Sequence, residues 1–291
     1  KPPADKPNIV FIFADDLGWT DLGCFGSEYY ESPNIDRLCD EGMKFTCGYT
    51  NAPNCAPTRA CLMTGRYAPR HGIYTVGSGA RGEEKFRKMI PVENVTDLPL
   101  DEVTLGQAMQ RAGYVTGMFG KWHLGLAPEY HPARRGFDEA ILTSRGHFAP
   151  KFRTTPSVPV PDGTYLADFL TDQAVAFIER HRDEPFFLYV PHNAVHTPIE
   201  AKDSSTAKFK DKPPVGGHRN PVYAGMIDSV DEGVGRILNT LDELKLADNT
   251  IVIFYSDNGG LGGYGELGGR TGRNITNNAP LRGGKGMLYE G

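Results

Sequence analysis

Four short apolar runs, separated by helical patterns, constrain the fold of this chain more than any other feature. The runs cover residues 8–14, 114–119, 186–190 and 250–255. They are rich in β-branched, aliphatic and aromatic residues, a pattern that predicts strands buried on both faces. Strands of this kind form sheets that helices cover on both sides.

Helical patterns lie between these runs, over residues 34–41, 105–112, 165–182 and 221–246. In the two longer segments apolar residues recur at intervals of three and four, which places them on one face of a helix. The segment 202–221, rich in Lys, Pro and Gly, is expected to be a surface loop. Strands that alternate with helices predict one α/β domain over residues 1–291, with a mostly parallel central sheet and helices on both faces.

Composition excludes two classes of partner. Among 291 residues the net charge is -5, and Lys and Arg are scattered along the chain, so nothing predicts nucleic-acid binding. The longest apolar run, residues 9–14, is far shorter than the roughly 20 residues of a membrane span. We therefore expect an enzyme or a binding protein without a membrane span.

Polar side chains follow each predicted strand. In open α/β sheets, ligands bind beyond the carboxyl ends of the strands, where such residues would meet. We therefore expect an active site at this edge of the sheet, built from Asp15, Asp16, Lys121, His123, His196, Asp257 and Asn258.

Asp15, Asp16, Asp257 and Asn258 form the candidate metal site. They offer three carboxylates and one amide, and three buried carboxylates would repel one another without a cation among them. Oxygen-only ligation suits Ca²⁺ or Mg²⁺ and does not suit Zn²⁺. Either pair alone is as readily explained by helix capping or turn formation. Because both pairs follow strands, the sequence favours a metal site.

Cations and titratable bases supply the other candidates. Lys121 and His123 lie two residues apart, which would place both side chains on one side of an extended segment. His196 lies in a short His-Thr-Pro turn beyond a strand, and Lys285 follows a glycine-rich connection, residues 259–272, that we expect to carry function. Taken singly, such a histidine is more often a hydrogen-bonded structural residue, and such a lysine is more often solvated.

Five cysteines all fall within the first 61 residues, and they form no C-x-x-C pair, which argues against a zinc ribbon or a thioredoxin-type site. Four of them are expected to be structural, as buried thiols or in bridges: Cys24, Cys39, Cys47 and Cys61. Cys55 differs because it lies in a polar segment with Pro53 and Pro57. That position suggests chemistry rather than packing.

The segment Cys55-Ala-Pro-Thr-Arg59, with Thr64-Gly65-Arg66 after it, resembles the sulfatase signature, in which C-x-P-(S/T)-R leads into a helical T-G-R segment. Thr58 stands where most members have Ser. The resemblance extends along nearly the whole chain. It includes, in order, Asp15-Asp16, the segment 120–125 (GKWHLG), the segment 196–198 (HTP), the segment 256–260 (SDNGG) and the segment 283–285 (GGK).

The resemblance to sulfatases implies a set of roles. A maturation enzyme would oxidise Cys55 to formylglycine, whose hydrated aldehyde is the nucleophile. Asp15, Asp16, Asp257 and Asn258 would bind the divalent cation, usually Ca²⁺, with Mg²⁺ as the alternative. The residues around the sulfate would be Arg59, Lys121, His123, His196 and Lys285. Of these, His123 would assist release of sulfate from the enzyme, and His196 with Lys285 would protonate the departing alcohol.

The same resemblance implies an α/β fold of the alkaline phosphatase superfamily and hydrolysis of sulfate monoesters, with sulfated carbohydrates as the expected substrates. It also implies a smaller C-terminal subdomain that this chain lacks, and export to the periplasm, the cell exterior or the lysosome. Two other functions stay open. One is hydrolysis of phosphate or phosphonate esters, and the other is binding of sulfated glycans without catalysis.

Overall fold

The computed structural model describes residues 6–80, 82–263 and 275–291. These residues contain a sheet whose strands run in the order β4-β3-β2-β5-β1-β6. Neighbouring strands are parallel except for the β3–β4 pair, which is antiparallel. The strands are β1 (Asn8–Ala14), β2 (Val115–Gly120), β3 (Glu139–Thr143), β4 (Thr154–Thr155), β5 (Phe186–Pro191) and β6 (Thr250–Ser256). The mostly parallel α/β sheet predicted from the sequence is confirmed.

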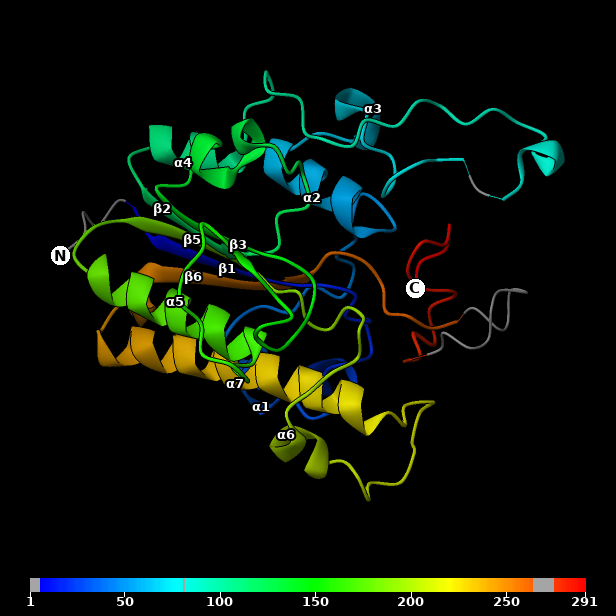
Figure 1. The fold of residues 1–291 in the computed structure, drawn as a ribbon. Coiled ribbons are helices and arrows are strands. Elements are labelled where there is room, and N and C mark those ends of the chain that lie inside the picture. Colours follow the sequence, from blue (N-terminus) through cyan, green and yellow to red (C-terminus); the bar gives the residue numbers. More distant parts are fainter. Residues whose placement is uncertain (1–5, 81, 264–274) are drawn as a thin grey trace.

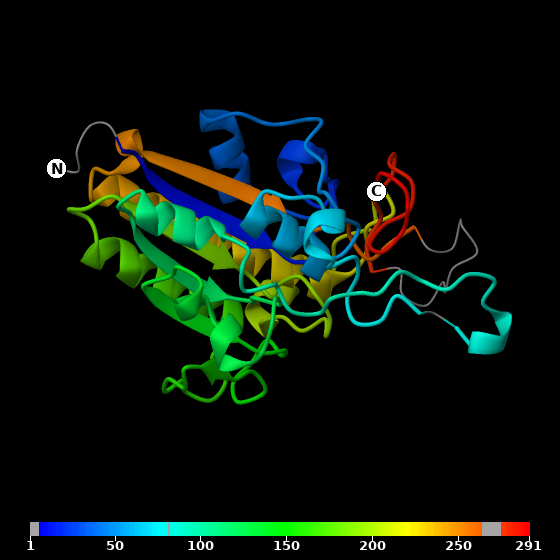
Figure 2. The ribbon, with the colours of Figure 1, turned by 90° about the horizontal axis from the view of Figure 1, so that it is seen from above.

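Helices cover both faces of this sheet. Figure 1 shows α2 and α4 on one face and α1, α5 and α7 on the other, and Figure 2 shows the first pair lying over the strands. The helices are α1 (Pro33–Glu41), α2 (Cys55–Thr64), α3 (Ala68–His71), α4 (Leu105–Arg111), α5 (Leu166–Arg180), α6 (Asp203–Ala207) and α7 (Pro221–Glu243). Short 3₁₀ helices are η1 (Gly23–Phe25), η2 (Glu84–Phe86), η3 (Pro128–Tyr130), η4 (Pro132–Arg134) and η5 (Ala247–Asn249).

Strand β5 shows why the apolar runs are continuous. Leu188 and Val190 belong to the core shared with α5 and α7, whereas Phe187 and Tyr189 belong to the core shared with α2. Successive side chains of a strand point to opposite faces, so both sets must be apolar when both faces are covered. None of the described helices combines the length and the apolarity that a membrane crossing needs.

The longest helix, α7, begins where its sequence predicts. Pro221 occupies the first turn, and the Asn220 side chain accepts hydrogen bonds from the backbone N–H groups of Val222 and Tyr223, both at 3.1 Å. An Asn cap before Pro is a favourable helix start, because the cap satisfies N–H groups that have no partner within the helix.

The expected surface loop at residues 202–221 is wrong in part, because α6 forms within it. Lys208 pairs with Asp228 of α7 at 2.8 Å, and Ser205 is buried against that helix. Packing on a long neighbour therefore stabilises a helix whose composition favours a loop. Of the glycine-rich connection at 259–272, residues 264–272 lie outside the described part of the chain.

Candidate functional site

The exits of four neighbouring strands are held together by backbone hydrogen bonds. Beyond β1, the N–H of Asp15 donates to the carbonyl of Ala194 at 2.9 Å, and the N–H of Val195 donates to the carbonyl of Asp15 at 2.7 Å. On the other side, the N–H of Asp257 donates to the carbonyl of Ala14 at 3.1 Å. After β2, the N–H of Lys121 donates to the carbonyl of Pro191 at 2.8 Å. The predicted convergence of strand exits is therefore confirmed for β1, β2, β5 and β6.

Cys55 is the first residue of α2, and its thiol lies among carboxylates. Only 1% of the residue is exposed, and Sγ is 3.4 Å from Asp15 Oδ1 and 4.0 Å from Asp16 Oδ1. Thr58, in the same turn, donates its hydroxyl proton to the Ala52 carbonyl at 2.9 Å. The helix ends at Thr64, so Gly65, in the left-handed region, and the following arginine lie beyond it. The expected helical T-G-R segment is therefore wrong in part.

Three carboxylates and this thiol form one buried cluster. Ligand atoms of Asp15, Asp16, Cys55 and Asp257 all lie within 4.8 Å of one another. Burial, together with the charge of Asp15, raises the pKa of Asp257 to about 7. Burial would also raise the pKa of Asp15, but the neighbouring lysine and arginine charges outweigh it and hold that pKa well below its usual value. The cluster is therefore a set of closely coupled acids.

Arg59 is buried beside the cluster, four residues after Cys55 on α2. Its Nη2 lies 2.8 Å from Asp257 Oδ2, and its Nη1 donates to the carbonyl of Lys121 at 2.9 Å. The guanidinium also lies 5.1 Å from the ring centroid of Phe13. Arg59 is only 1% exposed, so its guanidinium makes these contacts within the protein and holds Asp257 and the backbone after β2 in place.

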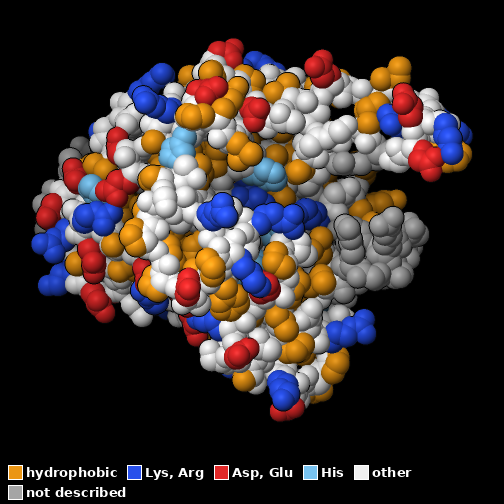
Figure 3. All heavy atoms as spheres, viewed as in Figure 1, with side chains coloured by type: hydrophobic (Ala, Val, Ile, Leu, Met, Phe, Trp, Pro, Cys, Tyr) orange, Lys and Arg blue, Asp and Glu red, His pale blue; other side chains and the backbone are white. Residues whose placement is uncertain are grey.

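Two lysines reach the cluster from distant parts of the chain, Lys121 directly after β2 and Lys285 near the C-terminal end. The ammonium of Lys121 contacts Asp15 Oδ2, and that of Lys285 lies 2.6 Å from Asp16 Oδ1. Their side chains are 14% and 17% exposed, so each contacts both the buried acids and the solvent side. Figure 3 shows Lys and Arg side chains gathered on this face, near the carboxyl ends of the strands.

His196 lies at the edge of the same cluster. Its Nε2 is 3.7 Å from Asp16 Oδ2, and its Nδ1 donates to the Thr197 carbonyl at 2.6 Å. His147 donates from Nε2 to the backbone carbonyl of His196 at 2.9 Å and so supports this turn. Burial lowers the pKa of His196 despite the nearby carboxylates. The side chain is 23% exposed, so it is accessible to solvent as well as near the cluster.

His123 joins the cluster by a route that the sequence did not predict. The segment after β2 is not extended at this residue, because His123 adopts a φ of 64°. Burial lowers the pKa of His123 to about 3, and the charges of Lys121 and Arg59 act in the same direction. The imidazole is therefore neutral at pH 7. Among the described residues its buried Nδ1 has no hydrogen-bond partner.

The donor set fits a divalent cation. Asp15, Asp16 and Asp257 present buried oxygens, and Asn258 contacts Asp16 Oδ1 through Nδ2 at 2.8 Å. In the described part of the chain, the buried Oδ1 of Asn258 accepts no hydrogen bond. A buried carbonyl oxygen without a donor beside three carboxylates is what a hard cation such as Ca²⁺ or Mg²⁺ would satisfy.

The sequence missed a second layer of polar residues behind the cluster. Asp21 is fully buried and accepts hydrogen bonds from the Gly18 N–H at 2.8 Å, from the Tyr223 hydroxyl at 2.6 Å and from the Thr276 hydroxyl. It thereby ties the turn after Asp16 to α7 and to the segment before Lys285. Its only sequence signal was an acid six residues after Asp15, which turn formation explains equally well.

Asn278 belongs to the same layer and joins two loops of the site. Its Nδ2 donates to the carbonyls of Gly260 at 3.2 Å and Gly283 at 3.0 Å, and its Oδ1 accepts from the Gly260 N–H at 3.1 Å. The backbone N–H of Lys285 donates to the same Gly260 carbonyl at 3.1 Å. Asn278 therefore links the loop that carries Asn258 to the loop that carries Lys285.

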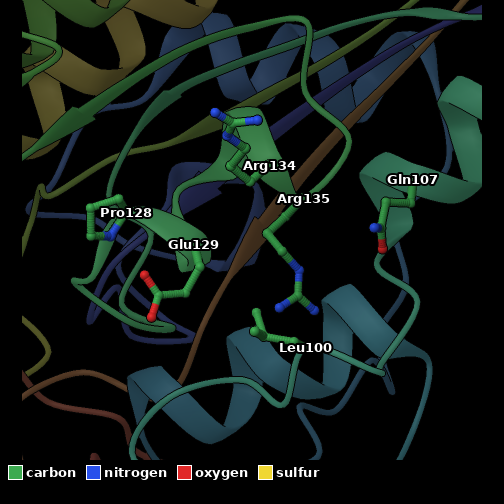
Figure 4. Close-up of a pocket in the computed structure, with 6 residues that line it drawn as sticks. All are labelled: Leu100, Gln107, Pro128, Glu129, Arg134 and Arg135. Carbon is green, nitrogen blue, oxygen red and sulfur yellow. The ribbon is translucent and has the colours of Figure 1, made fainter.

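A cavity of about 500 Å³ lies elsewhere, beside α4 (Figure 4). None of the predicted site residues lines it. Arg135 extends into this region and donates to the carbonyls of Leu98, Pro99 and Glu102 at 2.9 to 3.2 Å. This arginine therefore closes the turn before α4, and the cavity is separate from the cluster. The lining residues are Leu100, Gln107, Pro128, Glu129, Arg134 and Arg135.

Comparison with known proteins agrees with this site. The sulfatase family model matches residues 7–291, so the chain belongs to the sulfatase family, whose members depend on formylglycine and share the alkaline phosphatase superfamily fold. The N-acetylgalactosamine-6-sulfatase of Homo sapiens is 37% identical over 98% of this chain and 55% of its own length.

Solved structures show the same relationship. The crystal structure of Ps i-CgsB in complex with k-i-k-neocarrahexaose has a TM-score of 0.79 and 33% identity, over 98% of this chain and 64% of its own. The phosphonate monoester hydrolase of Agrobacterium radiobacter, at 20% identity and a TM-score of 0.62 over 87% of this chain and 62% of its own, shares the fold alone. The chain thus spans 55% to 64% of the length of these relatives.

Proposed function

We propose that residues 1–291 form the catalytic domain of a sulfatase that hydrolyses sulfate monoesters of carbohydrates. The observation that carries this proposal is the position of Cys55. Its thiol lies 3.4 Å from Asp15 inside a cluster of acids and cations, at the residue where the sulfatase signature has its modified cysteine. A buried thiol that served packing alone would not need three carboxylates around it.

The balance of charge supports an anionic substrate. Three carboxylates, those of Asp15, Asp16 and Asp257, face three permanent cations, which are Arg59, Lys121 and Lys285. The cluster is therefore close to neutral by itself. A bound divalent cation would make it positive by about two charges, and a sulfate monoester carries one negative charge. Preorganised positive charge of this kind stabilises charge that develops on the sulfate oxygens.

Two groups would complete the site. Asp15, Asp16, Asp257 and Asn258 would hold the Ca²⁺ or Mg²⁺ ion, which supplies positive charge for the sulfate. Formylglycine made from Cys55 would supply a hydrated aldehyde, whose hydroxyl is a nucleophile that can regenerate the aldehyde afterwards. An ordinary serine at this position would lack that second property.

The remaining side chains divide the work by position. Lys121 and Lys285, each partly exposed, would bind sulfate oxygens, while buried Arg59 holds Asp257 in place. Neutral His123, which lies close to Lys121 and Arg59, could accept a proton. His196, with its Nδ1 fixed by the Thr197 carbonyl, turns Nε2 toward the cluster. In its protonated form, which the charges of Asp15 and Asp16 favour, Nε2 would hold the proton for the departing alcohol.

Carbohydrate substrates are proposed from the relatives. One relative is named for a sulfated amino sugar, and a similar structure holds a neocarrahexaose. From its membership of the sulfatase family we also propose that the protein is exported and that a formylglycine-generating enzyme oxidises Cys55. A smaller C-terminal subdomain would complete the whole protein.

The test begins with the chemical state of residue 55. Trypsin releases it in the peptide of residues 45–59, and mass spectrometry distinguishes an aldehyde from a thiol there. The modified protein should release sulfate from sulfated oligosaccharides, and Cys55→Ala should fold but release none. Sulfate release by Cys55→Ala above a heat-inactivated control would refute the proposed nucleophile.

The same preparation separates the alternatives. Faster turnover of aryl phosphate or phosphonate esters than of aryl sulfate would favour the phosphate or phosphonate hydrolase. Binding of sulfated glycans without any turnover, by protein that carries formylglycine, would favour the binding protein.

A further inference from the structure

The thiols of Cys24 and Cys39 lie in two segments that the structure packs together. Cys24 belongs to η1 and Cys39 to α1, and the backbone N–H of Cys24 donates to Asp36 Oδ1 at 2.7 Å. Asp36 precedes Cys39 by three residues on the same helix, so both side chains lie on one face. Beyond the helix, Lys44 donates to the backbone carbonyl of Cys24 at 2.8 Å.

These two contacts hold the backbone of Cys24 from both sides. Residue 36 holds its N–H and residue 44 holds its carbonyl, and Cys39 lies between them in the sequence. The two thiols also influence each other directly. Burial, with the neighbouring Asp36 and Cys39 side chains acting in the same direction, raises the pKa of Cys24 to about 12. Because Asp36 holds the Cys24 N–H and shares one face of α1 with Cys39, the geometry places the Cys39 side chain next to Cys24.

The other three cysteines are placed differently. Cys55 lies in the catalytic cluster, and Cys61 is buried with its Sγ 3.4 Å from His71 Nε2. Cys47 is exposed. Cys24 and Cys39 are both half-buried, which leaves them open to a small oxidant while their segments stay packed.

We propose that Cys24 and Cys39 form a disulfide bond when the protein meets a small-molecule disulfide such as oxidised glutathione. In the exchange, the thiolate of one cysteine attacks the oxidant and releases one thiol, and the second cysteine then displaces the other thiol from the mixed disulfide. One disulfide is reduced to two thiols, and two cysteines are oxidised to one disulfide. The bond would link η1 to α1 and would leave the Cys55 thiol outside any bridge.

Trypsin makes the test direct, because its cleavage sites separate the relevant cysteines. Cys24 falls in the peptide 1–37, Cys39 in 38–44, both Cys47 and Cys55 in 45–59, and Cys61 in 60–66. The whole chain is incubated with oxidised glutathione, its remaining thiols are alkylated under denaturing conditions, and it is digested without reductant. We expect peptide 1–37 joined to peptide 38–44, two hydrogens lighter than their sum, and its loss after treatment with dithiothreitol.

Variants fix the assignment. The cross-link should persist in Cys47→Ser and disappear in Cys24→Ser, where Cys39 should become alkylated. The closed loop is about 15 residues long, so the oxidised wild type should unfold roughly 5–10 °C above its reduced form. The double variant Cys24→Ser/Cys39→Ser should show no difference between oxidised and reduced samples. Alkylation of both thiols after oxidation, or a link from peptide 38–44 to peptide 45–59, would overturn the proposal.

Discussion

Replacing Asn278 by Ala should weaken the site without touching any residue of the cluster. Asn278 is 1% exposed, and its side chain makes three hydrogen bonds to the loops that carry Asn258 and Lys285. Alanine removes all three. The Gly260 carbonyl keeps the Lys285 N–H as a donor, whereas the Gly260 N–H and the Gly283 carbonyl lose the Asn278 partner.

The magnitude follows from those two groups. A buried polar group left without its partner costs about 1–3 kcal/mol, so for two such groups the free energy of unfolding should fall by roughly 2–6 kcal/mol. For a chain of this size each kcal/mol lowers Tm by about 2–4 °C, which predicts a loss of Tm of roughly 4–24 °C. Displacement of Lys285 would also weaken its contact with the substrate. If the activation free energy rises by about 1.4 kcal/mol as a result, kcat should fall about tenfold.

Thermal unfolding measures the first effect and aryl sulfate turnover the second. The matched control is Asn277→Ala, the adjacent residue of the same type. Its Nδ2 donates to the Gly216 carbonyl at 3.0 Å in an exposed position, so we expect a loss of Tm below about 3 °C. Equal Tm values for Asn278→Ala and Asn277→Ala would refute the reasoning. A large loss of Tm with unchanged kcat, at a temperature where the variant is folded, would show that Asn278 does not position Lys285.

Three further outcomes are expected. Dialysis against a chelator should abolish sulfate release, and Ca²⁺ or Mg²⁺ should restore it better than Zn²⁺; full activity in excess chelator would contradict a metal at Asp257 and its neighbours. His196→Ala should lower kcat/KM about 10²–10⁴-fold for a sulfated sugar and much less for nitrophenyl sulfate, because the nitrophenolate leaving group needs no proton. His123→Ala should lower kcat/KM alike for both substrates. Equal losses for the two substrates in His196→Ala would refute its role as the acid. Burial would lower the pKa of His181, but the carboxylates of Glu139 and Glu184 outweigh it and raise that pKa. The protonated His181 therefore stabilises the fold below about pH 6.5, and this contribution is lost as pH rises through the raised pKa. His181→Gln should lower Tm more at pH 5.5 than at pH 8.5, and equal losses at the two pH values would contradict the pairing.

The sequence predicted the parts of the fold whose signal is local. Continuous apolar runs predicted β1, β2 and β5, because a strand buried on both faces must be apolar along its length. The run at residues 250–255 also predicted β6, but its expected burial on both faces is wrong, because β6 is an edge strand and is only half-buried. The short β3 and β4 were missed. Strand β3 is only half-buried, and β4 has two residues and depends on its partner for its existence. Helix α6 was missed for a similar reason, since contacts with α7 stabilise it.

The candidate site divides in the same way. Residues that follow strands, such as Asp15 and Asp257, were found because strand exits of a parallel sheet meet at one edge. The positive φ of His123 could not be found, because its local sequence favours an extended segment. Nor could Asp21 and Asn278, whose roles depend on hydrogen bonds to residues far away in the sequence. Long-range polar pairing leaves no periodicity in a single sequence.

The burial of Cys55 also limits the time during which another enzyme could reach its thiol as the chain is synthesised and folds. Asp257 and Lys285, which help to enclose its thiol, follow it by about 200 residues or more, and at roughly 5–20 residues per second their synthesis takes about 10–40 s or longer. During that interval the thiol is on the chain before the groups that enclose it exist. The formylglycine-generating enzyme proposed above would have this interval in which to act on an open segment. Faster translation would therefore shorten the time for maturation, and slow codons after residue 55 would lengthen it.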